Sequence, residues 1–278
     1  MVPPATTSAK PNKKMQAKVE LLSCTDADVA ICCTDQALAS ARLRHPALGD
    51  RGRMMLPGID PPFQVPPPYR PGAKFVIGHF GSLSITRHLG PIIAALEGLR
   101  QERPDLVEAT ELHVYGGPLD PVSSERLANS SVRQCVRHFG RIEADPQTGL
   151  SGREQILLRM RAVDVLLLLH GQEPICAEYI PSKLYEYLWM QRPIVALVHC
   201  NAQMAQMIRG QGHVAVLSGV QGASDADVDS ELRAALSGLF DRWRTQGLPD
   251  NGRSSPYTTR SAVAQLLGWV KPLEEARA

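Results

Sequence analysis

The 278-residue sequence has little charge of one sign, few aromatic residues and no long apolar run. Thirty basic residues against 28 acidic ones leave a net charge of +2, and aromatics make up only 5% of the chain. Bulk electrostatics therefore gives no reason to expect a nucleic-acid partner. No apolar run approaches the ~20 residues that a membrane-spanning helix needs. These absences predict a cytoplasmic globular protein, with peripheral membrane association as an open alternative.

The cysteines and acidic residues show no pattern typical of a metal centre. The six cysteines have no paired metal-ligand spacing, and Cys32 and Cys33 are adjacent on an expected strand. Reduced thiols are therefore expected rather than a disulfide framework. No Asp-x-Asp pair stands at the end of an expected strand, so no metal site is predicted. Residues 1–14 are rich in Pro, Thr, Ser and Lys, which predicts a disordered tail and not a signal peptide.

The first quarter of the chain differs in pattern from the remainder. Residues 57–72 are dense in proline, which sustains neither a helix nor a sheet, and we expect them to form a stiff linker between domains. Residues 15–56 before this linker are expected to form a small α/β segment, and residues 257–278 a closing helix. The elements expected in residues 15–56 are helices over 15–23 and 35–44 and strands over 28–33 and 53–56.

Between residues 73 and 256, short apolar runs alternate with amphipathic helical segments. This alternation predicts right-handed βαβ units, and therefore an α/β domain with a Rossmann-like parallel sheet and helices on both faces. The expected strands are 75–80, 111–115, 132–139, 163–169, 193–198 and 213–217. The expected helices are 86–100, 123–129, 152–161, 181–190, 202–209 and 225–243.

The segment that begins at Glu178 carries most of the functional signal. It places Glu178 and Glu186 around a Pro-Ser-Lys helix start, directly after the apolar strand expected at 163–169. A helix that begins at the carboxyl end of a strand directs unpaired N–H groups and a positive dipole end into the crevice above the sheet. Such a crevice suits a diphosphate. The amides expected to meet it are those of Ser182, Lys183 and Leu184.

The two carboxylates are expected at different depths of this site. Glu178 precedes the helix and is placed to face the part of a ligand beyond the phosphates. Glu186 lies one turn into the helix, within reach of a ribose, and a carboxylate accepts both hydroxyl protons of a vicinal diol. Two glutamates alone more often mark a solvated surface, but the preceding strand and the pattern around it favour the site.

Glycine follows several of the expected strands. Each such strand end needs a turn where a ligand and the backbone approach closely, and glycine lacks the Cβ that would block this approach. A single glycine of this kind is best explained as an ordinary turn residue. Together they favour a binding crevice along one edge of the sheet. They are Gly81, Gly116 with Gly117, Gly140 and Gly171.

Further motifs follow in order between about residue 26 and residue 270. They are Ala27-Asp28 before an apolar strand, the connection Met55–Asp60, the strand and glycine turn Phe75–Ser82, the strand Glu111–Gly117, the loop Val136–Ile142, and Pro256-Tyr257 before the last helix. With the Glu178–Glu186 segment, they resemble the C-terminal half of a group 1 (family 4) retaining glycosyltransferase of the GT-B fold. The resemblance implies a nucleotide-diphosphate-sugar donor and metal-independent transfer with retention of configuration, without a cofactor.

The resemblance also implies roles for individual residues. Glu178 would hold hydroxyls of the transferred sugar, and Glu186 the nucleotide ribose. Arg87 is the nearest match to a basic residue that meets the diphosphate. Lys183 could serve instead, and is about equally well explained as a solvated lysine at the helix start. The remaining donor contacts would come from the first glycine turn, the loop that faces the base and the helix amides. These residues are Gly81 and Ser82, Gly140 and Arg141, and Ser182 to Leu184.

Only the last elements of the family's N-terminal acceptor domain have a match here, in residues 15–56. A separate chain that supplies this domain is therefore an expected partner, beside the nucleotide sugar and an unidentified glycan, lipid or small-molecule acceptor. A non-catalytic nucleotide-sugar-binding or scaffold subunit and an inactive truncated remnant remain alternatives. A dinucleotide-binding oxidoreductase is weaker, because no Gly-x-Gly-x-x-Gly follows Phe80. Polysaccharide biosynthesis is the expected setting.

Overall fold

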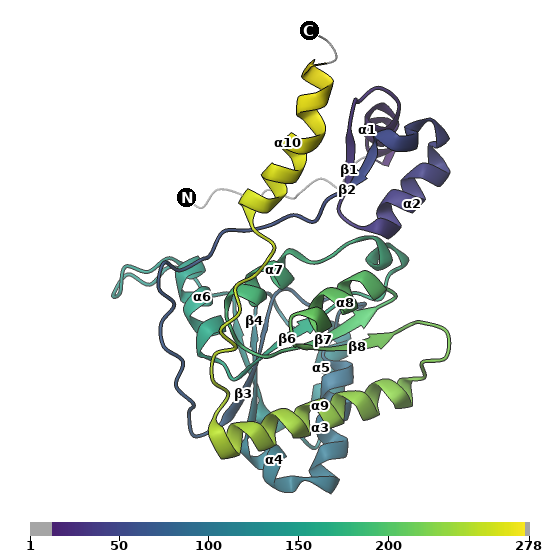
Figure 1. Cartoon of the computed structure of the whole chain (residues 1–278). Coiled ribbons are helices and arrows are strands. Elements are labelled where there is room, and N and C mark those ends of the chain that lie inside the picture. Colours follow the sequence, from purple (N-terminus) through teal and green to yellow (C-terminus); the bar gives the residue numbers. More distant parts are fainter. Residues whose placement is uncertain (1–12, 276–278) are drawn as a thin grey trace, which may run out of the picture. The chain divides into compact units, whose positions relative to one another are not determined.

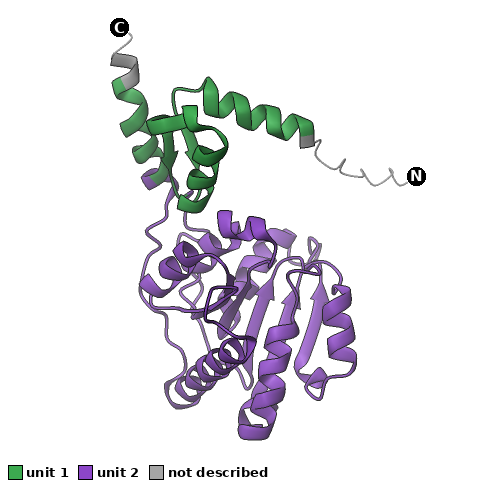
Figure 2. Ribbon diagram, turned by 90° about the vertical axis from the view of Figure 1, so that its right-hand side faces the viewer, with its two compact units in different colours: residues 1–56, 262–278 green, residues 57–261 purple. Residues whose placement is uncertain are grey.

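The computed structural model describes residues 13–275, and the chain divides into two compact units. One unit contains the residues up to Leu56 together with those from Ala262 onward, and the other contains Pro57–Ser261 (Figure 2). The tail expected over residues 1–14 lies outside the described residues except for its last two, which belong to helix α1 (Lys13–Thr25).

The larger unit is built on a six-stranded, entirely parallel sheet (Figure 1). The strand order is β5-β4-β3-β6-β7-β8, so the chain reverses direction across the sheet between β3 and β6. The strands are β3 (Phe75–Phe80), β4 (Thr110–Tyr115), β5 (Val136–Gly140), β6 (Val165–Leu169), β7 (Ile194–His199) and β8 (Val214–Ser218). The expected α/β fold with a Rossmann-like parallel sheet is confirmed.

Helices cover both faces of this sheet (Figure 1). One face packs against α3 (Gly90–Glu102), α4 (Pro104–Ala109), α5 (Pro121–Ala128) and α9 (Asp225–Gln246). The other carries α6 (Gly152–Ala162), α7 (Ser182–Trp189) and α8 (Ala202–Gly210). Every residue of β6 is buried, as expected for a parallel strand that is covered from both sides.

Local sequence signals set where several of these helices begin. Ser151 and Glu154 form a reciprocal capping box at the start of α6, and Ser224 and Asp227 form another at α9. The Asp120 carboxylate accepts the N–H of Ser123 at the start of α5, and Pro121 occupies the first position of that helix. Each cap satisfies N–H groups that have no partner within the helix.

Some expected boundaries were wrong. The helix expected over 86–100 begins at Gly90, because Ser84 and Arg87 exchange backbone hydrogen bonds of 2.8 and 3.0 Å in a tight turn. The strand expected over 132–139 starts with the 3₁₀ helix η2 (Arg133–Cys135), and the short helix α4 was missed. The apolar patterns located the cores of these elements but not their ends.

The proline-rich segment 57–72 is held against the larger unit by side chains. The Tyr69 ring lies under the Arg192 guanidinium, 3.3 Å from its carbon to the ring centre, and the Tyr69 hydroxyl donates to the Asp164 carboxylate. The Trp189 indole N–H donates to the carbonyl of Ile59 at 3.1 Å. These contacts anchor the segment, which is therefore more than a spacer.

The smaller unit has its own two-stranded parallel sheet of β1 (Ala30–Cys32) and β2 (Gly52–Met54). It also contains α1, α2 (Asp35–Arg44), the 3₁₀ helix η1 (Pro46–Arg51) and most of α10 (Thr259–Glu275). Arg51 donates to four backbone carbonyls, including those of Cys24 and Thr25 at the end of α1. Its core is small and centres on Leu38, Ala41 and Leu48.

Candidate functional site

The strand order places a crevice where the sheet reverses. From β3 the chain passes to α3 on one face, and from β6 it passes through the 3₁₀ helix η3 (Pro174–Glu178) to α7 on the other face. Open α/β sheets bind ligands at such a reversal, beyond the carboxyl ends of the strands. The residues expected to bind the donor stand in these loops.

The carboxyl ends of β3, β4 and β5 are tied together by glycines. The Gly81 N–H donates to the carbonyl of Tyr115, and the Gly116 N–H to the carbonyl of Gly140, both at 2.9 Å. A Cβ on Gly116 would lie 2.2 Å from the Gly81 carbonyl oxygen, so only glycine fits there. By contrast, Gly171 faces the Glu173 and Cys176 side chains. Three of the four glycine positions in the expected pattern therefore lie at the crevice, and Gly171 is the exception.

A cavity of about 940 Å³ opens beside these strand ends, in the size range of small-molecule sites. It lies between the ends of β3, β4 and β5 and the first turns of α6 and α7. Five of the expected site residues line it, namely Gly81, Ser82, Gly140, Arg141 and Lys183. The structure thus brings together residues that are up to 102 positions apart, from Gly81 to Lys183, in the sequence.

Glu186 is not among the residues that line this cavity, but it forms a charged cluster with two that are, Arg153 and Lys183. Its Oε2 accepts hydrogen bonds from Lys183 Nζ and Arg153 Nη1, both at 2.9 Å, and its side chain is 14% exposed. Burial alone would raise the pKa of Glu186, but the bonds from Arg153 and Lys183 outweigh it and hold the pKa below its ordinary value. Arg141 adds a third cation to the cavity, which is therefore suited to an anionic ligand.

Helix α7 presents an uncapped N-terminus. Pro181 precedes it and supplies no side-chain cap, so the amides of Ser182 and Lys183 have no acceptor within the helix. The amide of Leu184 differs from the expectation, because it donates to the carbonyl of Pro181 at 3.0 Å in a tight first turn. Leu184 is fully buried and supports the helix from below.

Arg87 and Glu178 lie outside the lining of this cavity. Arg87 Nη2 donates to the Tyr179 hydroxyl at 3.1 Å, and Tyr179 packs edge-on against His170 with ring centres 5.1 Å apart. Glu178 is the half-buried last residue of η3. The structure therefore divides the expected site into a part beside β4 and β5 and a part above β6.

Three residues that support this site were not anticipated. Arg153 pairs with Glu186 from another helix, and the buried Tyr187 hydroxyl accepts the Phe80 N–H at 3.1 Å. The Asn201 amide donates to carbonyls of Cys176, Ala177 and Tyr179, and so holds the loop of Glu178 in place. The capping box of Ser151 and Glu154 marks the start of the helix that carries Arg153, but no sequence signal predicts the contacts of these three residues.

Within residues 13–275, no three His, Cys, Asp or Glu side chains are grouped so as to hold a metal ion. None of the helices described there combines the length and apolar character that crossing a membrane requires.

No protein-family model and no curated protein matches the sequence. Solved structures do. WaaG, a glycosyltransferase involved in lipopolysaccharide biosynthesis, has a TM-score of 0.58 at 19% identity over 84% of this chain and 61% of its own. TarM has a TM-score of 0.55 at 12% identity over 95% of this chain and 47% of its own.

The α,α-trehalose 6-phosphate synthase of Burkholderia multivorans has a TM-score of 0.55 at 12% identity. It is matched over 95% of this chain and 63% of its own. This chain has the GT-B glycosyltransferase fold. At these identities the likeness concerns the fold alone, and the chain spans 61% of WaaG, 47% of TarM and 63% of the synthase.

Proposed function

We propose that the chain is a glycosyltransferase, or the donor-binding half of one, that moves a sugar from a nucleotide-diphosphate-sugar to a glycan, lipid or small-molecule acceptor. The observation that carries the proposal is the cavity of about 940 Å³ that Arg141, Arg153 and Lys183 line, with Arg153 and Lys183 bonded to the Glu186 carboxylate. Among the solved structures of the same fold, one of S. aureus TarM contains UDP.

The cavity suits the nucleotide half of such a donor. Its walls at Gly140 and Arg141 would face the base, and Glu186 the ribose hydroxyls. The diphosphate would lie between Ser82, Lys183 and the amide of Ser182. Arg87 would meet the sugar end of the diphosphate, and the transferred sugar would then extend toward Glu178 above β6, which agrees with the position of both residues outside the cavity.

The charged cluster at Glu186 suggests how the donor is bound. Without a ligand, Lys183 and Arg153 both bond to the Glu186 carboxylate. A diphosphate would compete for Lys183, because charge-assisted hydrogen bonds to phosphate oxygens are strong. Release of Lys183 would free carboxylate lone pairs for the ribose diol. Binding thus exchanges an internal ion pair for two contacts with the ligand.

The same cations would assist sugar transfer. The bond between the anomeric carbon and the diphosphate oxygen breaks, and a bond forms from the anomeric carbon to an acceptor hydroxyl oxygen, which loses its proton. Negative charge grows on the departing diphosphate, and fixed cations and amides stabilise it without reorganisation. Lys183, Arg87 and the first-turn amides of α7 would do this without a metal or cofactor. Retention of configuration is part of the proposal.

A thermal-shift screen of the purified chain against UDP-, GDP- and ADP-sugars, with and without EDTA, tests the proposal. We expect one nucleotide class to raise the melting temperature by several degrees, unaffected by EDTA, because a ligand that binds only the folded state stabilises it. Release of the nucleoside diphosphate with an acceptor extract would show transfer. Binding without release would favour a donor-binding subunit, and no shift with any donor would contradict the proposed site.

A further inference from the structure

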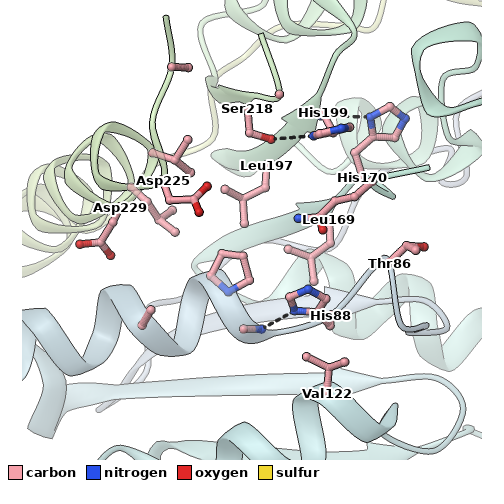
Figure 3. A pocket seen from close by; sticks show the side chains of 18 of the residues that line it. Thr86, His88, Val122, Leu169, His170, Leu197, His199, Ser218, Asp225 and Asp229 are labelled. Carbon is pink, nitrogen blue, oxygen red and sulfur yellow. Dashed lines mark hydrogen bonds between the residues drawn. The ribbon is translucent and has the colours of Figure 1, made fainter. Parts of the chain in front are cut away.

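A second cavity, of about 620 Å³, lies on the opposite side of the strand reversal (Figure 3). It stands above the carboxyl ends of β6, β7 and β8, between the first turn of α3 and the first turns of α9. It shares no lining residue with the cavity at Glu186. The donor contacts proposed above therefore leave it unused.

The floor of this second cavity is apolar and its rim is polar. Leu169 and Leu197 from the ends of β6 and β7 form the floor, and Val228 and Leu232 of α9 form a side wall. Asp225, on the first turn of α9, turns its carboxylate toward Leu197 (Figure 3). A flat apolar surface beside hydrogen-bonding groups is the arrangement that a sugar ring requires, because such a ring has both apolar faces and an edge of hydroxyls.

Two of the histidines that line the cavity accept backbone N–H groups at Nδ1. His88 Nδ1 accepts the Gly90 N–H at 3.1 Å, and His170 Nδ1 accepts the His199 N–H at 3.3 Å. An accepting ring nitrogen carries no proton, so the proton of the His170 ring lies on Nε2. Burial lowers the pKa of His170 to about 4, which keeps this ring neutral at physiological pH. Ser218 adds a hydroxyl beside His199 at 3.2 Å.

The charges of the second cavity differ from those of the first. Among residues 13–275, no lysine lines it and one arginine does, Arg126, which is engaged by Glu97. The acidic groups Asp225 and Asp229 stand on its α9 side. A phosphate would therefore meet carboxylates without a free cation, whereas a hydroxyl can donate to Asp225 and accept from a histidine. A purely apolar ligand would leave these polar groups unpaired.

We infer that this second cavity binds a neutral sugar ring, with Asp225 accepting from its hydroxyls and Leu169 and Leu197 under its face. The residues that line the cavity support a sugar as its ligand. That the ring belongs to the acceptor rests on the proposed function, because Thr86 and His170, which neighbour Arg87 and its hydrogen-bond partner Tyr179 near the proposed sugar end of the donor, also line this cavity.

Saturation-transfer NMR on the full chain with methyl α-glucoside, galactoside and mannoside tests this inference. We expect signals from at least one glycoside, and about tenfold weaker binding after Asp225→Asn, which corresponds to one lost hydrogen bond to a charged group. Ala94→Met, which fills the cavity from α3, should abolish the signals. Glu231→Gln, an exposed change on α9 outside the cavity, is the matched control and should leave them unchanged.

Saturating UDP separates this inference from the proposed function. Glycoside signals that persist with UDP bound place the sugar outside the Glu186 cavity and support the inference. Signals that UDP abolishes, that survive Asp225→Asn and Ala94→Met, or that are missing for all three glycosides would overturn it. The UDP thermal shift is measured on the same samples, so a failure of nucleotide binding is recognised independently.

Discussion

Glu178 and Glu186 look like a pair in the sequence but have different surroundings in the fold. Glu186 is held by two cations beside the larger cavity, whereas Glu178 ends a 3₁₀ helix above β6. The sequence could predict where both residues lie, because the strand and the helix start that flank them are local patterns. It could not predict the ion pair of Glu186 with Arg153, since a contact between α6 and α7 depends on how distant segments pack.

This difference predicts separate effects for the two glutamates. Glu186→Gln should weaken UDP binding about tenfold, because the neutral amide no longer accepts both ribose hydroxyls. Glu178→Gln should weaken the intact sugar nucleotide and leave UDP nearly unchanged. Isothermal titration with both ligands measures this. Glu111→Gln, a half-buried carboxylate that pairs with His113 and Arg137, is the control and should change neither affinity. Equal losses for both ligands in both variants would refute the separate roles.

Buried histidines predict how stability depends on pH. Burial lowers the pKa of His79 from 6.5 to about 4, while His79 Nδ1 donates to the Leu167 carbonyl at 3.2 Å. Below pH 6.5 the unfolded chain therefore binds a proton that the folded chain rejects, so stability falls as the pH drops from about 6.5 to about 4. His170 and His213 have pKa values lowered in the same direction.

Urea denaturation between pH 4 and 7 measures this effect. The free energy of unfolding should decline toward low pH in the native chain, and the decline should be shallower for His79→Gln, which keeps a donor for Leu167 without a titrating ring. The exposed His138→Gln is the control. A slope that His79→Gln leaves unchanged would show that another group governs the acid sensitivity.

At the scale of the elements, the sequence located buried strands and capped helices well. The unbroken apolar run of β6 and the capping box at Ser151 are local signals that the packing reinforces. It misplaced the start of α3, because a turn closed by backbone bonds between Ser84 and Arg87 leaves no mark in side-chain periodicity. The same limit explains why the tight first turn of α7 and the bonded amide of Leu184 were missed.

Substitution of glycine by alanine should have opposite effects on stability at two positions, one where the ends of β3 and β4 meet beside the cavity and one within α9. Gly116→Ala places a Cβ 2.2 Å from the Gly81 carbonyl oxygen at a φ of +148°, and should lower the free energy of unfolding by about 2 kcal/mol or more. Gly238→Ala, in open space within α9, should raise it by about 0.5–1 kcal/mol. Urea denaturation measures both. A neutral Gly116→Ala would mean that the strand ends separate freely.

At the scale of the whole molecule, the two units differ in how well their apolar residues are buried. The larger unit has a continuous core that includes Phe75, Leu96, Val195 and Phe240. In the part of the smaller unit that the structure describes, the core has five residues and two strands pair, although parallel strands are normally covered on both faces. The proline-rich segment was expected as a spacer, but its anchoring through Tyr69 depends on the distant Arg192 and Asp164.

Exposed apolar side chains on α1 predict self-association through the smaller unit. Met15, Val19 and Leu22 recur at helical spacing and are 59%, 56% and 47% exposed. Light scattering should show a mass that rises with concentration for the full chain but not for the fragment 57–261. Val19→Glu should reduce the association, because a charge in the contact must be desolvated. Leu158→Glu, at a 38% exposed leucine of α6, should not. A full chain that stays monomeric, or association that Val19→Glu leaves intact, would show that the apolar side chains of α1 do not mediate self-association.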